Sequence, residues 1–129
     1  MKMPAYAGVV RRGTNLPNSI REKQIRKVGG NIQFEGFLST SARTDFNFSG
    51  KDQYLICSKN GRTIWDLSSF ANEKEILFLP NSTFRVLQYK DDGISRWLLA
   101  EVDVQTGNVA DCSKDPAFSL DIDRHWTGH

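Results

Sequence analysis

The sequence predicts a single α+β domain dominated by antiparallel strands, and three observations lead to that prediction. The chain has 129 residues, of which 39% are hydrophobic and 25% charged, as expected for one folded domain of ordinary composition. One helical segment lies early in the chain, and a series of short alternating segments follows it, separated by turn residues. No long helical pattern lies between these strands, which argues against a doubly wound parallel sheet.

The first predicted elements are a strand and a helix. Residues 7–12 (AGVVRR) have the character of a short strand, which we expect to end at Gly13. The helix should begin near Asn18 or Ser19, either of which could cap it. Its apolar positions lie on roughly one face and run to the expected end of the helix: Ile20, Ile25 and Val28.

The later strands follow at short intervals. We expect them at 32–41, 53–59, 75–79, 83–90 and 94–104. Gly36 interrupts the first of these and suggests a bulge, while Asn60-Gly61 after the second is a strong turn signal. The core therefore covers about residues 7–107. The polar tail, 108–129, could cap a sheet edge, bind a partner or lack order.

Composition and charge give no support to several functions. The net charge of +2 is too small to indicate a nucleic-acid or membrane partner, and no apolar run is long enough to cross a bilayer. Cys57 and Cys112 give neither a disulfide framework nor the spacing of a metal site. The tail places His125 near two aspartates, Asp121 and Asp123, but a solvated tail is the simpler interpretation. We therefore expect no metal.

Three polar clusters interrupt the apolar strands: RRG at 11–13, STS at 39–41 and EKE at 73–75. Each alone has a structural explanation, such as an edge charge or a strand end. Together they supply an arginine that can bind phosphate, hydroxyls that can orient a carboxylate, and a pair of glutamates. A carboxylate beside a sugar can stabilise an oxocarbenium-like transition state, and a second can act on the incoming nucleophile. These residues indicate glycosidic cleavage of a phosphorylated sugar compound.

In their order and in the residues that flank them, the three clusters resemble the motifs of the mono-ADP-ribosyltransferases of the Arg, Ser-Thr-Ser, Glu-x-Glu class, which includes many bacterial toxins. The matching segments are RRGTNLP, GGNIQFEGFLSTSA and GRTIWDLSSFANEKEILFLPNSTFRVL, so the resemblance covers about residues 9–88. It implies a core of two roughly perpendicular antiparallel β-sheets with few helices. It also implies that NAD, the substrate, lies in the cleft between the sheets.

The resemblance also implies roles on the donor side. Arg12 would contact NAD, with Arg11 as the competing assignment, since alternation lets only one of the two face the cleft. The Gly13 backbone would bind the nicotinamide amide. Ser39 would hold Glu75, which acts on the nicotinamide ribose, while residues 40–41 support the strand. The strand and loop residues expected near NAD are Thr40, Ser41, Phe46 and Phe48.

On the acceptor side, the resemblance implies that Glu73 orients the acceptor and helps deprotonate it. A glutamate at this position points to an arginine of a target protein, whose guanidinium suits a carboxylate partner. Ser69 and Phe70 are candidates for touching that protein. We expect a monomeric toxin domain, secreted or injected, that acts in the target-cell cytoplasm and could meet an immunity protein. The alternatives are an NAD glycohydrolase, a nucleic-acid acceptor, which the mild charge disfavours, and an inactive binding module.

Overall fold

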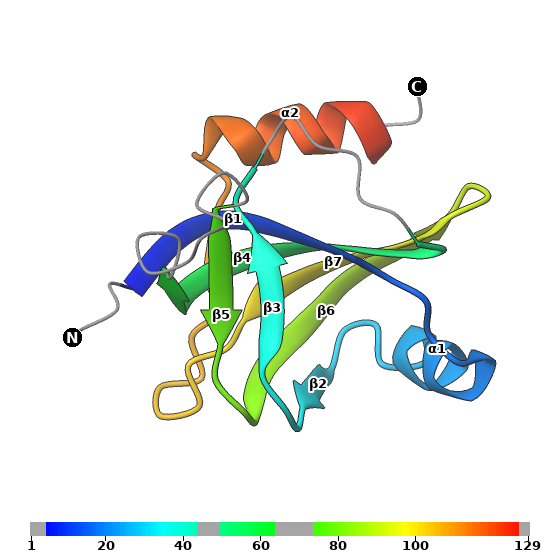
Figure 1. The fold of residues 1–129 in the computed structure, drawn as a ribbon, viewed down its shortest axis with the longest axis horizontal. Coiled ribbons are helices and arrows are strands. Elements are labelled where there is room, and N and C mark those ends of the chain that lie inside the picture. Colours follow the sequence, from blue (N-terminus) through cyan, green and yellow to red (C-terminus); the bar gives the residue numbers. More distant parts are fainter. Residues whose placement is uncertain (1–4, 44–49, 64–73, 127–129) are drawn as a thin grey trace.

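The chain forms a bent sheet with two short helices in the parts that this computed structural model describes, residues 5–43, 50–63 and 74–126 (Figure 1). In chain order the elements are β1 (Ala5–Thr14), α1 (Asn18–Ile25), β2 (Asn31–Phe34), β3 (Leu38–Ser41), β4 (Asp52–Thr63), β5 (Glu75–Phe78), β6 (Ser82–Asp91), β7 (Ser95–Glu101) and α2 (Pro116–His125). The strand order is β1-β3-β5-β4-β7-β6-β2, with an additional pairing of β1 and β4. The predicted α+β class with few helices is confirmed.

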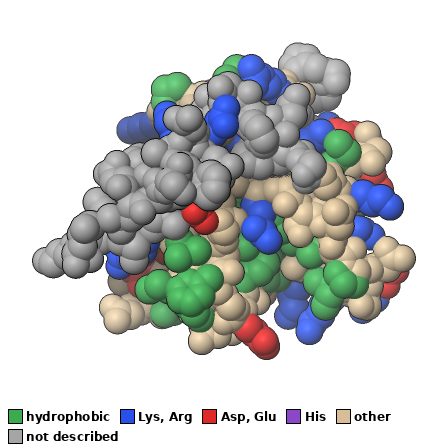
Figure 2. Space-filling view, in the orientation of Figure 1, with side chains coloured by type: hydrophobic (Ala, Val, Ile, Leu, Met, Phe, Trp, Pro, Cys, Tyr) green, Lys and Arg blue, Asp and Glu red, His purple; other side chains and the backbone are tan. Residues whose placement is uncertain are grey.

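Charged side chains of both signs are dispersed over the described part of the face that Figure 2 shows. Figure 2 shows Lys and Arg side chains (blue) at several separated places on the described part of one face, with Asp and Glu (red) among them. This distribution fits the small net charge of +2. On this face the described residues do not form the continuous basic surface that nucleic-acid binding favours.

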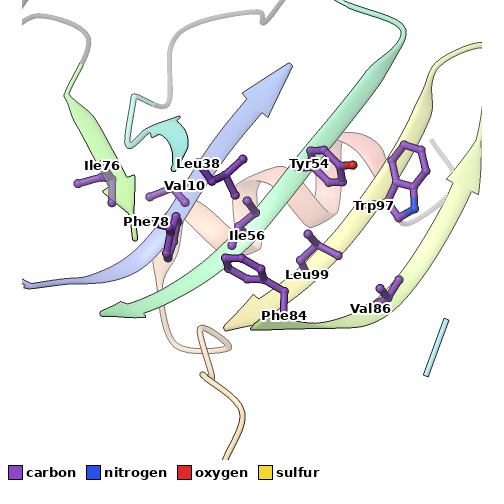
Figure 3. Close-up of a cluster of buried hydrophobic side chains, with 10 residues drawn as sticks. All are labelled: Val10, Leu38, Tyr54, Ile56, Ile76, Phe78, Phe84, Val86, Trp97 and Leu99. Carbon is purple, nitrogen blue, oxygen red and sulfur yellow. The ribbon is translucent and has the colours of Figure 1, made fainter. Parts of the chain in front are cut away.

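The sheet carries a hydrophobic core on each face. Alternation along β1 sends Val10 into the larger core and Val9 into the smaller one. In the larger core, side chains of β3 and β5 pack with those of β1, β4, β6 and β7. Figure 3 shows its ten buried residues on one face of the sheet: Val10, Leu38, Tyr54, Ile56, Ile76, Phe78, Phe84, Val86, Trp97 and Leu99. The smaller core lies between the sheet and α2.

Strands β3 and β5 run across the direction of β1 and β4 (Figure 1). Strand β1 pairs with β4 along almost its whole length but with β3 at a single position, Arg11 opposite Ser41. The two layers predicted as separate sheets are therefore joined into one continuous hydrogen-bonded sheet, at this pair and where β5 pairs with the end of β4. Beyond the pair, β1 continues along β4 while β3 continues along β5.

Two expectations about β4 differ from the structure. Its pairing with β7 is parallel, so the sheet is not wholly antiparallel. The turn expected at Asn60-Gly61 is wrong, because the strand continues through both residues to Thr63. The register shifts here, and the amides of Lys59 and Asn60 both donate to Oε1 of Glu101 at 2.7 Å. A Cβ on Gly61 would lie 2.6 Å from Ile76 Cγ2, so the glycine permits close packing rather than a turn.

The single strand expected over 32–41 is two strands in different places. Strand β2 pairs with β6, and β3 pairs with β5. Gly36 lies in the connection between them and does not form the expected bulge, because the chain leaves one part of the sheet and enters another.

Polar contacts, more than an apolar face, hold α1. Pro17 precedes the helix without a side-chain cap, so the expected Asn18 or Ser19 cap is wrong. Ile25 packs on the larger core, whereas the other two expected apolar contacts, Ile20 and Val28, are exposed. The helix is instead anchored to β4, where Arg21 makes two hydrogen bonds to the buried Asp52 at 2.7 and 2.8 Å.

The C-terminal segment is built into the fold. Cys57 and Cys112 form a disulfide between β4 and this segment, so the expectation of no disulfide framework is wrong. Asp115 caps α2 by accepting a hydrogen bond from the Ala117 amide at 2.9 Å. The helix covers a face of the sheet, and Asp121, expected in a solvated tail, is only 5% exposed.

Candidate active site

Strands β3 and β5 bring the Ser-Thr-Ser and Glu-x-Glu motifs together. Their antiparallel register places Ser41 opposite Glu75 and Ser39 opposite Leu77, so the side chains of Ser39, Ser41 and Glu75 share one face. On that face the Ser39 hydroxyl donates to Oε2 of Glu75 at 2.5 Å. The hydroxyl thus fixes one oxygen of the carboxylate and restricts its rotamer.

Arg12 of β1 contacts Ser39 through the backbone of β3. Its side chain alternates to the face that bears Val10, and Nη1 donates to the backbone carbonyl of Ser39 at 2.9 Å. The residue is half-buried, which leaves part of its guanidinium accessible. Arg12, Ser39 and Glu75, up to 63 positions apart in the chain, are therefore linked by two consecutive contacts.

Arg11 lies on the other face of β1 in a different environment. Its guanidinium forms an ion pair with Asp121 of α2, and Nη1 donates to the Arg43 carbonyl at 2.8 Å. The residue is only 8% exposed. The two neighbouring arginines are thus separated as strand alternation requires, and Arg12 is the one in contact with Ser39.

The remaining described motif residues support the strands. Thr40 points into the core, and its hydroxyl donates to the Ile76 carbonyl at 2.8 Å. The Ser41 hydroxyl accepts a hydrogen bond from the Arg43 amide at 3.2 Å. Gly13 does not end β1 as expected, because it remains in the strand opposite Gln53.

The chain enters β5 through a constrained backbone. Lys74 has a φ of 48°, in the left-handed region that residues with a side chain seldom adopt. Its carbonyl accepts a hydrogen bond from the Ala42 amide at 3.0 Å, which extends the β3–β5 ladder to the residue before Glu75. The remaining predicted site residues lie outside the described residues: Glu73, Phe46, Phe48, Ser69 and Phe70.

Sequence reasoning missed Asp121, the ion-pair partner of Arg11. The apolar residues around it recur at helical spacing, with Phe118, Ile122 and Trp126 all packed on the smaller core. That period could have revealed an amphipathic helix with Asp121 near its buried side. The partner of the aspartate could not have been read from the sequence, because 110 positions separate it from Arg11.

The described residues give no sign of a metal site or of a membrane span. No group of three or more His, Cys, Asp or Glu side chains among them is arranged to hold a metal ion. Within the same ranges, neither α1 nor α2 is long and apolar enough to cross a bilayer.

Solved structures share this fold. An ADP-ribosyltransferase of Pseudomonas syringae pv. tomato, HopU1, has a TM-score of 0.69 at 22% identity, over 77% of this chain and 47% of its own. The type III effector XopAI of Xanthomonas axonopodis pv. citri also has a TM-score of 0.69, at 17% identity over 77% of this chain and 45% of its own. Exoenzyme S of Pseudomonas aeruginosa, solved with 14-3-3 protein beta and carba-NAD, has a TM-score of 0.65 at 22% identity, over 92% of this chain and 59% of its own. The fold is that of the ADP-ribosyltransferases.

Curated relatives add similarity of sequence, although no family model matches the chain. The NAD(+)–protein-arginine ADP-ribosyltransferase Tre1 of Serratia proteamaculans is 37% identical over 102 residues, which are 78% of this chain and 22% of that protein. A putative NAD(+)–arginine ADP-ribosyltransferase, Mav, of Mycobacterium avium is 39% identical over 92 residues, 67% of this chain and 11% of that protein. The predicted resemblance to arginine ADP-ribosyltransferases is confirmed. The chain spans about a fifth or less of the length of these relatives.

Proposed function

We propose that this chain is an NAD-dependent mono-ADP-ribosyltransferase domain that modifies an arginine of a target protein and releases nicotinamide. The observation that supports this most directly is the 2.5 Å hydrogen bond from Ser39 to Glu75, with Arg12 on the Ser39 carbonyl at 2.9 Å. It unites in one place the three motifs that suggested glycosidic chemistry.

On the donor side, the bond that breaks joins C1′ of the nicotinamide ribose to the nicotinamide nitrogen. The bonding electron pair leaves with nicotinamide, and positive charge develops on the ribose. Glu75, held by Ser39, accepts a hydrogen bond from the ribose 2′-hydroxyl and stabilises that charge. Arg12 supplies a permanent positive charge for the phosphates of NAD, and the Gly13 backbone binds the nicotinamide amide.

On the acceptor side, a guanidinium nitrogen of the target arginine attacks C1′ and forms the new N-glycosidic bond. Glu73 orients the guanidinium and accepts the proton that the nitrogen loses. The names of both curated relatives, which specify arginine as the acceptor, favour this choice.

The same comparisons support a proposal for the setting of the reaction. One structural neighbour, XopAI of Xanthomonas axonopodis pv. citri, is a type III effector, and this likeness favours an exported toxin or effector domain that acts inside a target cell. The partner is then a protein that presents an arginine, and an immunity protein would protect the producing cell. The dispersed charge in Figure 2 favours a protein acceptor over a nucleic acid.

Incubation of the purified chain with labelled NAD and a cell lysate tests the proposal. We expect a discrete labelled protein, whose modified residue mass spectrometry identifies as arginine. Glu75→Gln is the control and should give no label and no nicotinamide. Nicotinamide release without any labelled macromolecule would replace the transferase with a glycohydrolase, in which water takes the place of arginine. Label on nucleic acid would change the acceptor.

A further inference from the structure

Arg11 bridges three parts of the fold that are distant in sequence. Its backbone forms the single β1–β3 pair, opposite Ser41. Its guanidinium contacts Asp121 of α2 on one side and the Arg43 carbonyl on the other, the latter at 2.8 Å. The side chains of the ion pair are 9% and 7% exposed, so this bridge is shielded from solvent.

The segment held by this bridge leads directly to the site. Residues 41–43 include the last serine of the Ser-Thr-Ser motif and the carbonyl that Arg11 binds. Ser41 is paired with Glu75, and the Ala42 amide donates to the Lys74 carbonyl at 3.0 Å. A displacement of the Arg43 backbone would therefore move the ladder that sets the position of Glu75, and the strained Lys74 makes that position sensitive to its support.

The chemistry of the bridge requires an arginine. A guanidinium has donors on separate nitrogens in a rigid plane and can bind a carboxylate and a carbonyl at once, whereas an ammonium is a compact point charge. Asp121 balances the buried charge, and loss of one partner from such a pair leaves the other uncompensated. The pair is thus suited to hold two backbone segments in one arrangement.

We propose that Arg11 is a positioning residue and that α2, through Asp121, is part of the active-site architecture. The inference rests on the proposed function, because the group that it positions is Glu75. Arg11 acts through the backbone of residues 41–43 and does not touch NAD, which leaves the substrate contact to Arg12. The C-terminal helix then supports catalysis without contributing a residue to the reacting atoms.

Asp121→Asn tests the inference, with Asp52→Asn as its matched control. Both changes neutralise the aspartate of a buried Arg–Asp pair, but Asp52 holds α1 and makes no contact with residues 41–43. At a temperature where both variants are folded, Asp121→Asn should lower kcat for nicotinamide release about 10- to 100-fold, with KM for NAD within about twofold. Asp52→Asn should keep kcat within about twofold of the unchanged protein. Equal loss of kcat in the two variants at equal loss of Tm would reduce the effect to stability and overturn the inference.

Arg11→Lys serves as the second variant, and it remains decisive if Asp121→Asn fails to fold. It keeps the positive charge beside Asp121 but cannot also reach the Arg43 carbonyl in the same geometry. We expect a loss of kcat in the same range, again with little change in KM. Turnover equal to that of the unchanged protein would show that the bridge to residue 43 is not needed.

Amide hydrogen exchange gives a readout that is independent of activity. The Ala42 amide should exchange faster in Asp121→Asn and Arg11→Lys than in Asp52→Asn, because its bond to the Lys74 carbonyl depends on the bridge. Unchanged exchange at Ala42 would contradict the inference. If the unchanged protein released no nicotinamide, the proposed function would fail, and exchange at Ala42 would still decide whether Arg11 positions this segment.

Discussion

At the scale of single residues, the hydroxyl of Ser39 orients the carboxylate of Glu75. The Ser39 hydroxyl donates to Oε2 of Glu75. No described residue donates a hydrogen bond to Oε1, so this oxygen remains for a ligand. A carboxylate held in one rotamer before substrate arrives loses less side-chain freedom in the transition state. The hydrogen bond from Ser39 to Glu75 is therefore a preorganising contact, and each partner can be removed separately.

Removal of the two partners should have graded effects. Glu75→Gln should lower nicotinamide release more than about 100-fold, because the negative charge that stabilises the ribose is lost. Ser39→Ala should lower it about tenfold, since the carboxylate remains but is less well oriented. Ser58→Ala removes another strand hydroxyl, bonded to the Tyr6 carbonyl, and serves as the control for general destabilisation. Equal release by Glu75→Gln and the unchanged protein would remove Glu75 from the chemistry.

Glu73 gives the corresponding prediction for the acceptor. Glu73→Gln should abolish transfer to protein while nicotinamide release into water continues, because only the arginine requires the second carboxylate. The measurement pairs labelled-protein formation with free nicotinamide in the same reaction. Parallel loss of both activities would mean that the two glutamates do not divide the reaction as proposed.

At the scale of elements, buried polar contacts hold both helices. Helix α1 is anchored by the bidentate contact of Arg21 with Asp52, and α2 by the contact of Asp121 with Arg11. Asp52 also accepts a hydrogen bond from the Leu16 amide at 2.8 Å, which fixes the loop between β1 and α1. Hydrogen-bonded ion pairs are directional, unlike apolar packing, so each of these contacts fixes a helix at one position against the sheet.

The environment of Asp52 predicts sensitivity to acid. Burial by itself raises the pKa of Asp52, but hydrogen bonds from Arg21 and from the Leu16 amide outweigh it and hold the pKa below the ordinary value. A folded-state pKa below the unfolded one gives stability that is fully present above about pH 4 and is lost as the pH falls through the folded pKa. Chemical denaturation from pH 7 to pH 2 should show this loss.

Two substitutions check that assignment. Asp52→Asn should be less stable at pH 7, by about 2–4 kcal/mol, and its stability should fall less between pH 4 and pH 2. Asp92→Asn is the control, because Asp92 pairs with Arg96 at the surface with 35% of its side chain exposed, and a screened pair contributes little. An acid profile of Asp52→Asn parallel to that of the unchanged protein would exclude Asp52 as the responsible group.

At the scale of the whole molecule, the disulfide joins the C-terminal segment to the centre of the sheet. Cys57 lies in β4, which pairs with β1, β5 and β7, and Cys112 lies just before α2. The 55-residue separation closes a loop that contains β5, β6 and β7. The bond therefore restricts the unfolded chain and keeps α2 near the sheet that it covers.

Reduction of this bond should destabilise the protein. For a loop of this length, chain entropy suggests a loss of about 4 kcal/mol on reduction or in the Cys57→Ser/Cys112→Ser variant. Denaturant unfolding with and without reductant measures it. The double variant is its own control, because reductant should leave its unfolding midpoint unchanged. Identical midpoints for oxidised and reduced protein would show that the segment is held by packing alone.

The sequence by itself predicted the elements and the chemistry that local patterns encode. The positions of β1, β6 and β7 follow from alternation and turn residues, and the Arg, Ser-Thr-Ser and Glu-x-Glu clusters suggested glycosidic cleavage and the resemblance that the relatives confirm. Local patterns failed where distant partners decide the outcome. Asn60-Gly61 favours a turn, but the amides of Lys59 and Asn60 donate to the distant Glu101 and the chain continues in β4.

Only the tertiary structure decided which residues meet. Strand alternation predicted that Arg11 and Arg12 face opposite ways. Only the fold shows that Arg12 contacts Ser39 and that Arg11 pairs with Asp121. The segment expected to be a polar tail contains helix α2, and the disulfide of Cys112 joins this segment to the sheet. The physical reason is that hydrophobic periodicity and turn propensity act over a few residues, whereas ion pairs and disulfides depend on where the chain returns after many.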